Sequence, residues 1–296
     1  MPELPEVECV RRGLEPTLAD HSFVQVQARR PDLRFPLPPR FARRLEGQTV
    51  GKLARRAKYL LAHLTSGDVL VMHLGMTGRF SVRRRVEQGG VLLGDFTSEA
   101  GHASGKHDHV VFSMSGGATV TYNDARRFGF MLLIPDNELD EHPLFKGLGV
   151  EPLSRELTAG YLANLAAGSG RDLKAFLMDQ RVVAGLGNIY VCEALFRARL
   201  APSRKASTLS KCNGLPSSLA GRLVPAIRTV LEEAIAAGGS TLRDYRRADG
   251  SEGGFQDRFC IYGRAGEPCV RRGCRGIVRR SIQGGRSSFH CPVCQR

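Results

Sequence analysis

Pro2 and Glu3 place a possible nucleophile beside a possible proton carrier at the start of the sequence. A methionine that precedes proline is normally removed after synthesis, which leaves the proline with a free secondary amine. Such an amine attacks an aldehyde carbon and forms an iminium ion without losing a further proton, and a terminal amine has a lower reference pKa than lysine. Glu3 can carry protons during such a reaction. Taken alone, the pair is more typical of a frayed terminus that has no role.

Four of the eight cysteines form two close pairs, Cys269 with Cys274 and Cys291 with Cys294, separated by sixteen residues. Two such pairs supply four thiolates for one tetrahedral Zn²⁺, and four thiolates leave no position open for a substrate. We therefore predict one structural Zn²⁺ per chain and no organic cofactor. The alternative is a pair of disulfides, which a reduced cytosolic protein disfavours. The residues between the pairs predict a hairpin that turns at 284–285.

Three loop-like segments carry residues suited to phosphates or to a base stack. The Gly-rich segment 185–190 joins two helical stretches, and backbone N–H groups at a helix start bind phosphate. Asn188 can add a donor there or serve as the N-cap of the following helix. Met76 lies in HLGMTG, and Arg126 and Phe128 lie in DARRFG. These side chains are suited to wedging into a base stack, although Met76 and Phe128 could instead be core residues.

The charge balance points to a polyanionic partner. The chain has 43 basic and 29 acidic residues, a net charge of +14, and arginine supplies 36 of the basic residues. Phosphates attract such a surface, and arginine suits bidentate contact with them. The alternative is a basic protein without a specific partner. There is no apolar run of about 18 residues and no apolar core of a secretory signal, so we expect a cytoplasmic protein that does not span a membrane.

The elements that must position these groups change along the chain. Before residue 135, short segments with period two predict strands over 23–28, 59–64, 69–74, 109–114 and 118–122. Lys58 lies where one of these strands begins. A helix is predicted over 5–18, and residues 81–105, which show little periodicity, predict a surface loop.

Helical spacing takes over after residue 135, with segments over 161–167, 173–179, 189–198 and 215–238. The predicted fold class is α+β and multidomain, with an N-terminal β-sandwich, flanking helices, a C-terminal helical domain and a zinc-ribbon hairpin. The expected boundaries are 1–135 for the β-sandwich, 136–152 for a linker, 153–259 for the helical domain and 260–296 for the zinc finger.

Together these motifs resemble the formamidopyrimidine-DNA glycosylase family of base-excision repair enzymes. The resemblance runs nearly end to end, because MPELPEVE, RRAKYL, HLGMTG, KHDH, ARRFG, MDQRVVAGLGNIY, GRSSFHCPVCQ and the cysteine spacing follow the family's order. The PELPEVE start resembles the purine-directed branch rather than the endonuclease VIII branch. The resemblance implies a catalytic β-sandwich, a helix-two-turn-helix DNA-binding domain and a zinc finger in a monomer that acts on duplex DNA.

The resemblance also implies a mechanism. A bifunctional glycosylase and AP lyase extrudes 8-oxoguanine or a formamidopyrimidine from the duplex, and Pro2 attacks the sugar C1′ to form a Schiff base. Glu3 acts as the acid and base during ring opening, and the strand is then cut by β,δ-elimination. Lys58 assists protonation or β-elimination, and Arg286 binds phosphate at the lesion and assists the second elimination.

The resemblance further implies the DNA contacts. His73 and Asn188, with Lys58 and Arg286, grip the backbone, and residues 240–254 form a loop that closes over the extruded base. Arg126 reads the opposite base, preferably cytosine. The full set of contacts implied is His73, Met76, His107, Arg126, Phe128, Arg171 and Asn188. Two alternatives stay open: an oxidised-pyrimidine glycosylase of the endonuclease VIII type, and a non-catalytic protein that binds DNA lesions.

Overall fold

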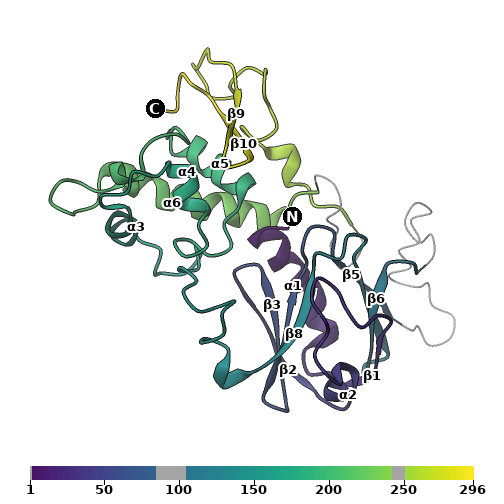
Figure 1. Ribbon diagram of the computed structural model, residues 1–296. Helices are drawn as coiled ribbons and strands as arrows, with labels where there is room; N and C mark the ends of the chain where they lie inside the picture. Colours follow the sequence, from purple (N-terminus) through teal and green to yellow (C-terminus); the bar gives the residue numbers. More distant parts are fainter. Residues whose placement is uncertain (1, 85–104, 242–250) are drawn as a thin grey trace. The chain divides into compact units, whose positions relative to one another are not determined.

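The computed structural model describes residues 2–84, 105–241 and 251–296 (Figure 1). Their contacts form two compact units, the first made of residues 1–146 and 237–254 and the second of residues 147–236 and 255–296. The chain therefore passes between the units at 146–147, inside the segment predicted as a linker. A separate zinc-finger domain that begins at residue 260 stays a prediction.

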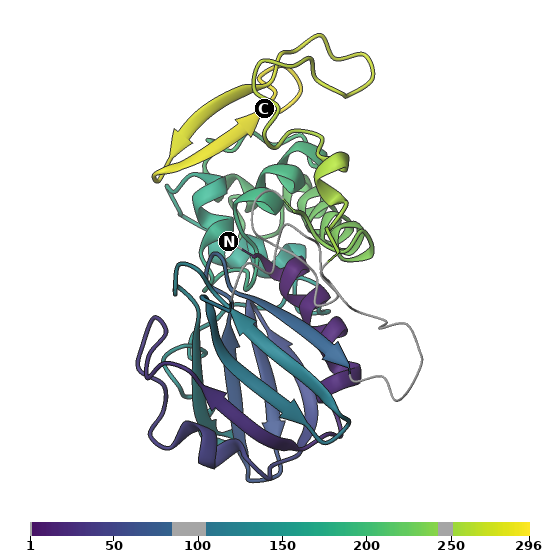
Figure 2. The same cartoon turned by 90° about the vertical axis from the view of Figure 1, so that its right-hand side faces the viewer.

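The first unit is built on two antiparallel four-stranded sheets (Figure 2). One sheet has the order β1 (Phe23–Ala28), β6 (Asp108–Met114), β7 (Ala118–Asn123), β5 (Arg79–Arg84). The other has the order β2 (Val50–Arg56), β3 (Tyr59–Leu64), β4 (Asp68–His73), β8 (Phe130–Pro135). Side chains from both sheets, such as Phe112 and Met72, share one buried core, which confirms the β-sandwich.

Helix α1 (Leu4–Leu18) covers part of this core. Its apolar face, which includes Val7, Val10 and Leu14, is buried in the sandwich. The helix begins one residue earlier than predicted, with Glu3 as its N-cap and Pro5 in its first turn. Two short helices, α2 (Phe41–Leu45) and η1 (Asp136–Glu138), complete the unit as far as it is described.

Three strands escaped the sequence prediction. In β8 the run FMLLIP is apolar throughout, so it lacks the alternation that marks a half-buried strand. In β2 and β5, the basic residues hide a short apolar pattern. The loop prediction is wrong for residues 81–84, which belong to β5 and pair with β7. Residues 85–104 of that predicted loop lie outside the described residues, as do 242–250 of the predicted base-closing loop.

The second unit contains the four predicted helices, with ends shifted by at most three residues. They are α3 (Ala159–Ala166), α4 (Leu173–Met178), α5 (Asn188–Arg197) and α6 (Ser218–Ala236), with 3₁₀ turns η2 (Ala206–Leu209) and η3 (Phe255–Arg258). The apolar stripe of α6 is buried at Leu223, Ile227 and Leu231. Across the described ranges, none of the helices combines the length and apolar character needed to cross a bilayer.

The predicted hairpin is confirmed. Strands β9 (Arg279–Gln283) and β10 (Arg286–His290) pair antiparallel around a two-residue turn. Both turn residues, Gly284 and Gly285, have positive φ angles of 54° and 73°. This is the conformation that a tight hairpin turn demands and that glycine adopts without steric cost.

Candidate functional site

The N-terminal turn holds Pro2 and Glu3 in a buried position within the first unit. Glu3 is the N-cap of α1, and its backbone N–H donates to Oε2 of Glu6 at 2.9 Å. Pro2 is itself buried and is bonded to a residue whose backbone N–H is held by Glu6.

Glu6 is a residue that the sequence analysis missed. Its side chain is 2% exposed, and its Oε1 accepts hydrogen bonds from the backbone N–H (2.9 Å) and hydroxyl (3.1 Å) of Ser240. One carboxylate therefore joins the start of the chain to residue 240, more than two hundred positions away. The available signal was a glutamate three residues after an N-cap, which is the spacing of a capping box.

Lys58 lies in the tight turn between β2 and β3, as predicted from the strand that follows it. Ala57, the other turn residue, has a φ of 52°, a left-handed conformation that is uncommon for a residue other than glycine. Arg55 donates to the Ala57 carbonyl at 2.8 Å and so supports this turn. Lys58 is 8% exposed, and lysine is rarely buried to this degree unless its charge is paired.

His73 ends β4, and its ring is stacked on Phe130 at a centroid distance of 5.1 Å. Its Nδ1 accepts the Gly75 backbone N–H at 3.1 Å, so in the neutral ring the proton resides on Nε2. Burial, followed by the charges of Lys58 and Arg34, lowers the pKa of His73 from 6.5 to about 4. At neutral pH the side chain is therefore an uncharged donor through Nε2.

The two loops predicted to wedge into a base stack have exposed side chains at their tips. Met76 is 36% exposed and Phe128 is 43% exposed, so the core alternative is wrong for both. The Arg126 guanidinium lies over the Phe128 ring, 4.6 Å from its centroid. An exposed thioether and an arginine stacked on an aromatic ring are well suited to contact with bases.

A fully buried carboxylate, that of Asp124, joins these two loops. It accepts hydrogen bonds from the Thr77 hydroxyl, from the Tyr122 hydroxyl at 3.2 Å and from the Gly129 N–H at 2.8 Å. The Thr77 oxygen in turn accepts the backbone N–H of Arg126 at 3.1 Å. The wedge loops therefore form one structural part.

Backbone contact brings the loops closer still. A Cβ added to Gly75, whose φ is +61°, would lie 2.3 Å from the carbonyl carbon of Phe128. Only glycine allows that approach. The half-buried His107 adjoins the same part, since its carbonyl accepts the Asp124 N–H at 3.0 Å.

In the second unit, the start of α5 carries Asn188. Gly187 is the N-cap of this helix and Asn188 its first residue, so the N-cap alternative for Asn188 is wrong. The amide of Asn188 instead donates to the carbonyl of Ser287 at 3.0 Å. That carbonyl directly follows the exposed Arg286, which begins β10.

A second donor to the same carbonyl was not predicted. Lys174 of α4 is 1% exposed, and its Nζ donates to the Ser287 carbonyl at 2.9 Å and to the Ser288 hydroxyl at 2.6 Å. Lys174 and Asn188 thus attach the hairpin strand that bears Arg286 to the helices of the second unit.

Arg171 is exposed but already has partners. Its guanidinium pairs with Asp179 at 3.1 Å and donates to the Ala175 carbonyl at 2.9 Å. The hydrogen bonds of Arg181 first, and then of Arg171, lower the pKa of Asp179 to about 2. A phosphate contact by Arg171 stays a prediction.

The four terminal cysteines converge. The sulfurs of Cys269, Cys274, Cys291 and Cys294 all lie within 4.8 Å of one another. The sulfurs of Cys269 and Cys294 are 3.8 Å apart, and those of Cys274 and Cys291 are 3.6 Å apart. Tetrahedral Zn–S bonds of about 2.3 Å would place sulfurs roughly 3.8 Å apart, so the residues fit a four-thiolate zinc site.

The predicted residues fall in both units. Pro2, Glu3, Lys58, His73, Met76, His107, Arg126 and Phe128 belong to the first, and Arg171, Asn188, Arg286 and the four cysteines to the second. Pro2, Lys58 and the wedge loops therefore share one unit, and Asn188, Arg286 and the cysteines share the other.

Comparison with known protein families gives two matches along the chain. Residues 1–131 match the formamidopyrimidine-DNA glycosylase N-terminal domain, and residues 148–246 match the formamidopyrimidine-DNA glycosylase H2TH domain. The two matches cover most of the chain and include every predicted site residue outside the zinc hairpin.

Similar proteins extend over the full length. A formamidopyrimidine-DNA glycosylase of Methylobacterium sp. (strain 4-46) is 58% identical and covers 100% of this chain and 99% of its own. One of Bradyrhizobium sp. (strain BTAi1) is 57% identical and covers 100% of both.

Solved structures show the same fold. A Lactococcus lactis Fpg in complex with DNA that contains an abasic site has a TM-score of 0.83 at 29% identity and covers 100% of both chains. The MutM (Fpg) protein of Thermus thermophilus has a TM-score of 0.80 at 39% identity and covers 99% of this chain and 98% of its own. A Lactococcus lactis variant in complex with Fapy-dG containing DNA has a TM-score of 0.82 at 30% identity, with full coverage of both chains.

Proposed function

This chain belongs to the formamidopyrimidine-DNA glycosylase family, and on that premise we propose that Pro2 carries the chemistry of a DNA glycosylase and AP lyase acting on oxidised purines. The observation that supports the role of Pro2 is its buried place directly before Glu3, the N-cap of α1. A nucleophile must be held at a constant position to reach a sugar carbon, and a helix start provides that constraint.

The proposed reaction begins once Met1 is removed and Pro2 has a free secondary amine. The nitrogen of Pro2 forms a bond to C1′ of the damaged nucleotide and gives up its N–H proton. The C1′–N bond to the base breaks, and the base leaves with the electron pair and takes up a proton. Glu3 donates a proton to O4′, so that the sugar ring opens and a Schiff base to Pro2 forms. The Schiff base acidifies the C2′ hydrogen. Loss of that proton expels the 3′ phosphate, and a second elimination expels the 5′ phosphate.

The remaining residues have proposed roles in binding. Lys58 and His73 in the first unit, and Asn188 and Arg286 in the second, contact backbone phosphates on either side of the extruded nucleotide. His73 does so as a neutral donor, because its pKa is about 4. His107 and Arg171 supply further phosphate contacts.

The wedge loops occupy the space that the extruded nucleotide leaves. Met76, Arg126 and Phe128 enter the base stack, which offsets part of the cost of unstacking. Their exposure and their attachment through Asp124 support this role, since a wedge must be both accessible and stiff.

The proposed role of the zinc hairpin is to position Arg286, and its metal takes no part in the reaction. We propose that Cys269, Cys274, Cys291 and Cys294 hold one structural Zn²⁺, which organises the hairpin and supplies no open coordination position. We also propose that the protein acts as a monomer in the cytoplasm.

Borohydride trapping tests the proposal. A duplex with 8-oxoguanine opposite cytosine should give a reduced covalent adduct with the wild type and none with Pro2→Gly. Pro5→Ala is a matched control, because it alters a second proline of the same turn and should retain the adduct. The proposal fails if Pro2→Gly still traps, or if mass spectrometry finds Met1 on protein that traps. Trapping only on oxidised pyrimidines would favour the endonuclease VIII type, and lesion binding without any adduct would favour a non-catalytic binder.

A further inference from the structure

A hollow of about 590 Å³ opens between β1 and α2 in the first unit. Its volume is within the range of small-ligand pockets, about 300–1,000 Å³. None of the residues with a proposed role in catalysis or DNA binding lines it. Four of its lining residues are arginines, and the apolar ones are Ala28, Pro31, Leu37, Pro38, Phe41 and Ala42. A smaller hollow of about 460 Å³, between residues 32–34 and 126–128, belongs to the wedge loops already described.

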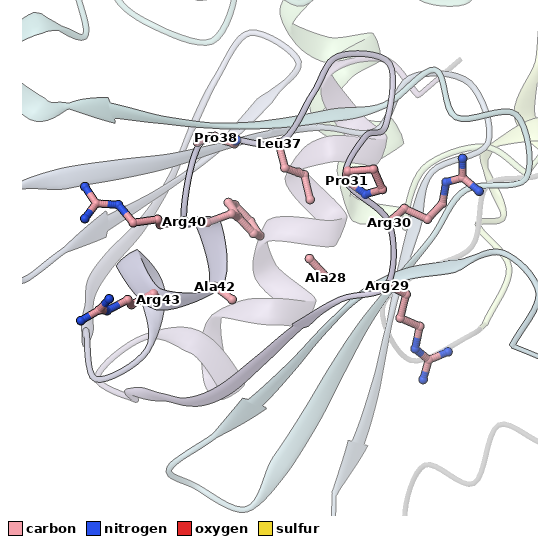
Figure 3. Close-up of a pocket in the computed structure, with 10 residues that line it drawn as sticks. Ala28, Arg29, Arg30, Pro31, Leu37, Pro38, Arg40, Ala42 and Arg43 are labelled. Carbon is pink, nitrogen blue, oxygen red and sulfur yellow. The ribbon is translucent and has the colours of Figure 1, made fainter.

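The apolar and the charged groups of the larger hollow occupy different places. Figure 3 shows the side chain of Leu37 directed into the hollow. The arginine side chains point away from its centre, with Arg40 and Arg43 on one side and Arg29 and Arg30 on the other. The hollow therefore has an apolar centre between two pairs of guanidinium groups.

The two arginine pairs differ in how far their charge is already balanced. Arg29 lies 3.8 Å from the carboxylate of Asp108, and Arg30 lies 3.3 Å from that of Asp32. Arg40 and Arg43 are exposed, and neither forms an ion pair with a carboxylate in the described ranges. The side of the hollow formed by α2 therefore keeps its positive charge.

The wall of the hollow is held in shape by its own backbone. Residues 31–39 include four prolines, each of which fixes its own φ angle. The N–H of Leu37 donates to the Pro31 carbonyl at 2.9 Å, and that of Phe41 donates to the Pro38 carbonyl at 3.0 Å. A hollow that exists before binding costs a ligand little conformational entropy.

Duplex DNA fits this surface poorly. Phosphates can pair with the arginines, but the DNA backbone carries no apolar side group that would fill the centre of the hollow. Phe41, the one aromatic residue of the described lining, is 4% exposed and so presents no ring for base stacking. Figures 1 and 2 also place α2 at the end of the sandwich opposite the first turn of α1, which Glu3 caps.

An acidic protein segment with a large apolar side chain fits both features. The apolar side chain would be removed from water in the centre of the hollow. Carboxylates before and after it would reach the guanidinium groups on the two sides, and arginine binds a carboxylate through two parallel hydrogen bonds.

We propose that this hollow is a docking site for an acidic segment of a partner protein, which inserts an apolar side chain between the two arginine pairs. Arg40 and Arg43, whose charge is not balanced by a described carboxylate, supply most of the electrostatic attraction. The inference goes beyond the proposed function, because it concerns where the protein is recruited and leaves the reaction at Pro2 unchanged.

The test uses a labelled synthetic peptide that has a leucine and a phenylalanine at its centre and glutamates on both sides. Fluorescence anisotropy measures its dissociation constant with the full-length protein at physiological salt, where non-specific attraction between exposed charges is screened. A second peptide has serines in place of the two apolar residues. We expect the wild type to bind the first peptide and to bind the second at least about tenfold more weakly.

Two variants have matched controls. Arg43→Glu is compared with Arg222→Glu, which changes the net charge equally at an exposed arginine of α6. Ala28→Phe fills the hollow from an exposed position, and Gln25→Phe adds the same ring to β1 outside it. We expect Arg43→Glu and Ala28→Phe to weaken binding of the first peptide about tenfold, and the controls to leave it unchanged. All four variants should keep the wild-type melting temperature and the borohydride adduct.

Three outcomes would overturn the docking site. The first is a wild type that binds neither peptide, or binds both equally well, since the apolar centre would then contribute nothing. The second is equal weakening by Arg43→Glu and Arg222→Glu, which would indicate attraction by net charge alone. The third is displacement of the peptide by a lesion-containing duplex together with weaker DNA binding by Arg43→Glu, which would assign the hollow to DNA. The peptide measurement involves no DNA chemistry, so failure of the adduct assay would leave this inference intact.

Discussion

The Lys174 ammonium is buried among the helices of the second unit and donates to the carbonyl of Ser287, the residue directly after Arg286. Lys174 is thus placed to hold the hairpin strand that presents Arg286. Since Asn188 donates to the same carbonyl, the strand is fixed at one point by two side chains. A buried lysine is unfavourable unless its hydrogen bonds are satisfied, which these contacts achieve.

Lys174→Met should therefore weaken the contribution of Arg286 to DNA binding, although Lys174 acts on Arg286 only through the neighbouring Ser287. The variant fills a similar volume but removes two hydrogen bonds, which costs about 1–3 kcal/mol when a buried partner loses its donor. We expect a lower melting temperature, and a shallower dependence of DNA affinity on salt that approaches the slope of Arg286→Ala. Lys205→Met, at an exposed lysine, is the control and should keep the wild-type slope. A Lys174→Met protein with wild-type melting and slope would refute the positioning role.

Removal of the metal should unfold the hairpin. Metal analysis is expected to give one Zn²⁺ per chain, and Cys291→Ser should lose it together with most DNA affinity, because so small a segment lacks an apolar core of its own. Cys212→Ser, at an exposed thiol outside the cluster, should retain both metal and binding. A metal-free wild type with full activity would contradict the zinc assignment.

The depressed pKa of His73 makes stability depend on pH in one direction. The unfolded chain binds a proton at this side chain near pH 6.5, whereas the folded chain does so only near pH 4. The contribution of neutral His73 is therefore complete above pH 6.5 and is lost as the pH falls toward 4, by about 3 kcal/mol at most. Urea unfolding of the wild type and of His73→Gln between pH 4 and pH 7.5 should show a shallower fall for the variant. Parallel curves of unfolding free energy against pH for the two proteins would rule out the lowered pKa of His73.

Gly75→Ala should separate the two wedge loops. Its Cβ would meet backbone atoms of Phe128 and Gly129 within 2.6 Å, in addition to the strain of a positive φ. Gly67→Ala is the matched control, because Gly67 also has a positive φ but nothing lies within 4 Å of its Cβ. The control should cost roughly 1–2 kcal/mol from the left-handed backbone alone. Gly75→Ala should cost more and also slow lesion excision at least tenfold. Equal melting temperatures for the two variants would show that the two loops move apart without a measurable loss of stability.

The sequence predicted those parts of the fold that local patterns record. Period-two segments gave most of the sandwich strands, the cysteine spacing gave the cluster, and Gly284 with Gly285 gave the hairpin turn. The strand β8 was missed because both of its faces are largely apolar, so that no alternation marks it. Residues 81–84 were assigned to a loop because arginines obscure a short strand pattern.

Predictions within the candidate site divide in the same way. Pro2 and Lys58 could be identified because they lie in motifs. Glu6 and Lys174 could not, because their hydrogen-bond partners, such as Ser240 for Glu6, are distant in sequence. The role of a buried polar side chain depends on which atoms the fold brings within about 3 Å of it, and this information is not local. The same limit explains why a shared hollow between residues 32–34 and 126–128 could not be predicted.

The Asp124 carboxylate bonded to both wedge loops has a practical consequence for protein engineering. Replacing 74–78 alone with a segment that lacks Thr77 would leave the buried Asp124 carboxylate short of a donor, and replacing 124–129 alone with a segment that lacks Asp124 would leave the Thr77 hydroxyl without its acceptor; either exchange would loosen the joined loops. Libraries aimed at altered lesion preference should therefore exchange 74–78 and 124–129 as a single cassette.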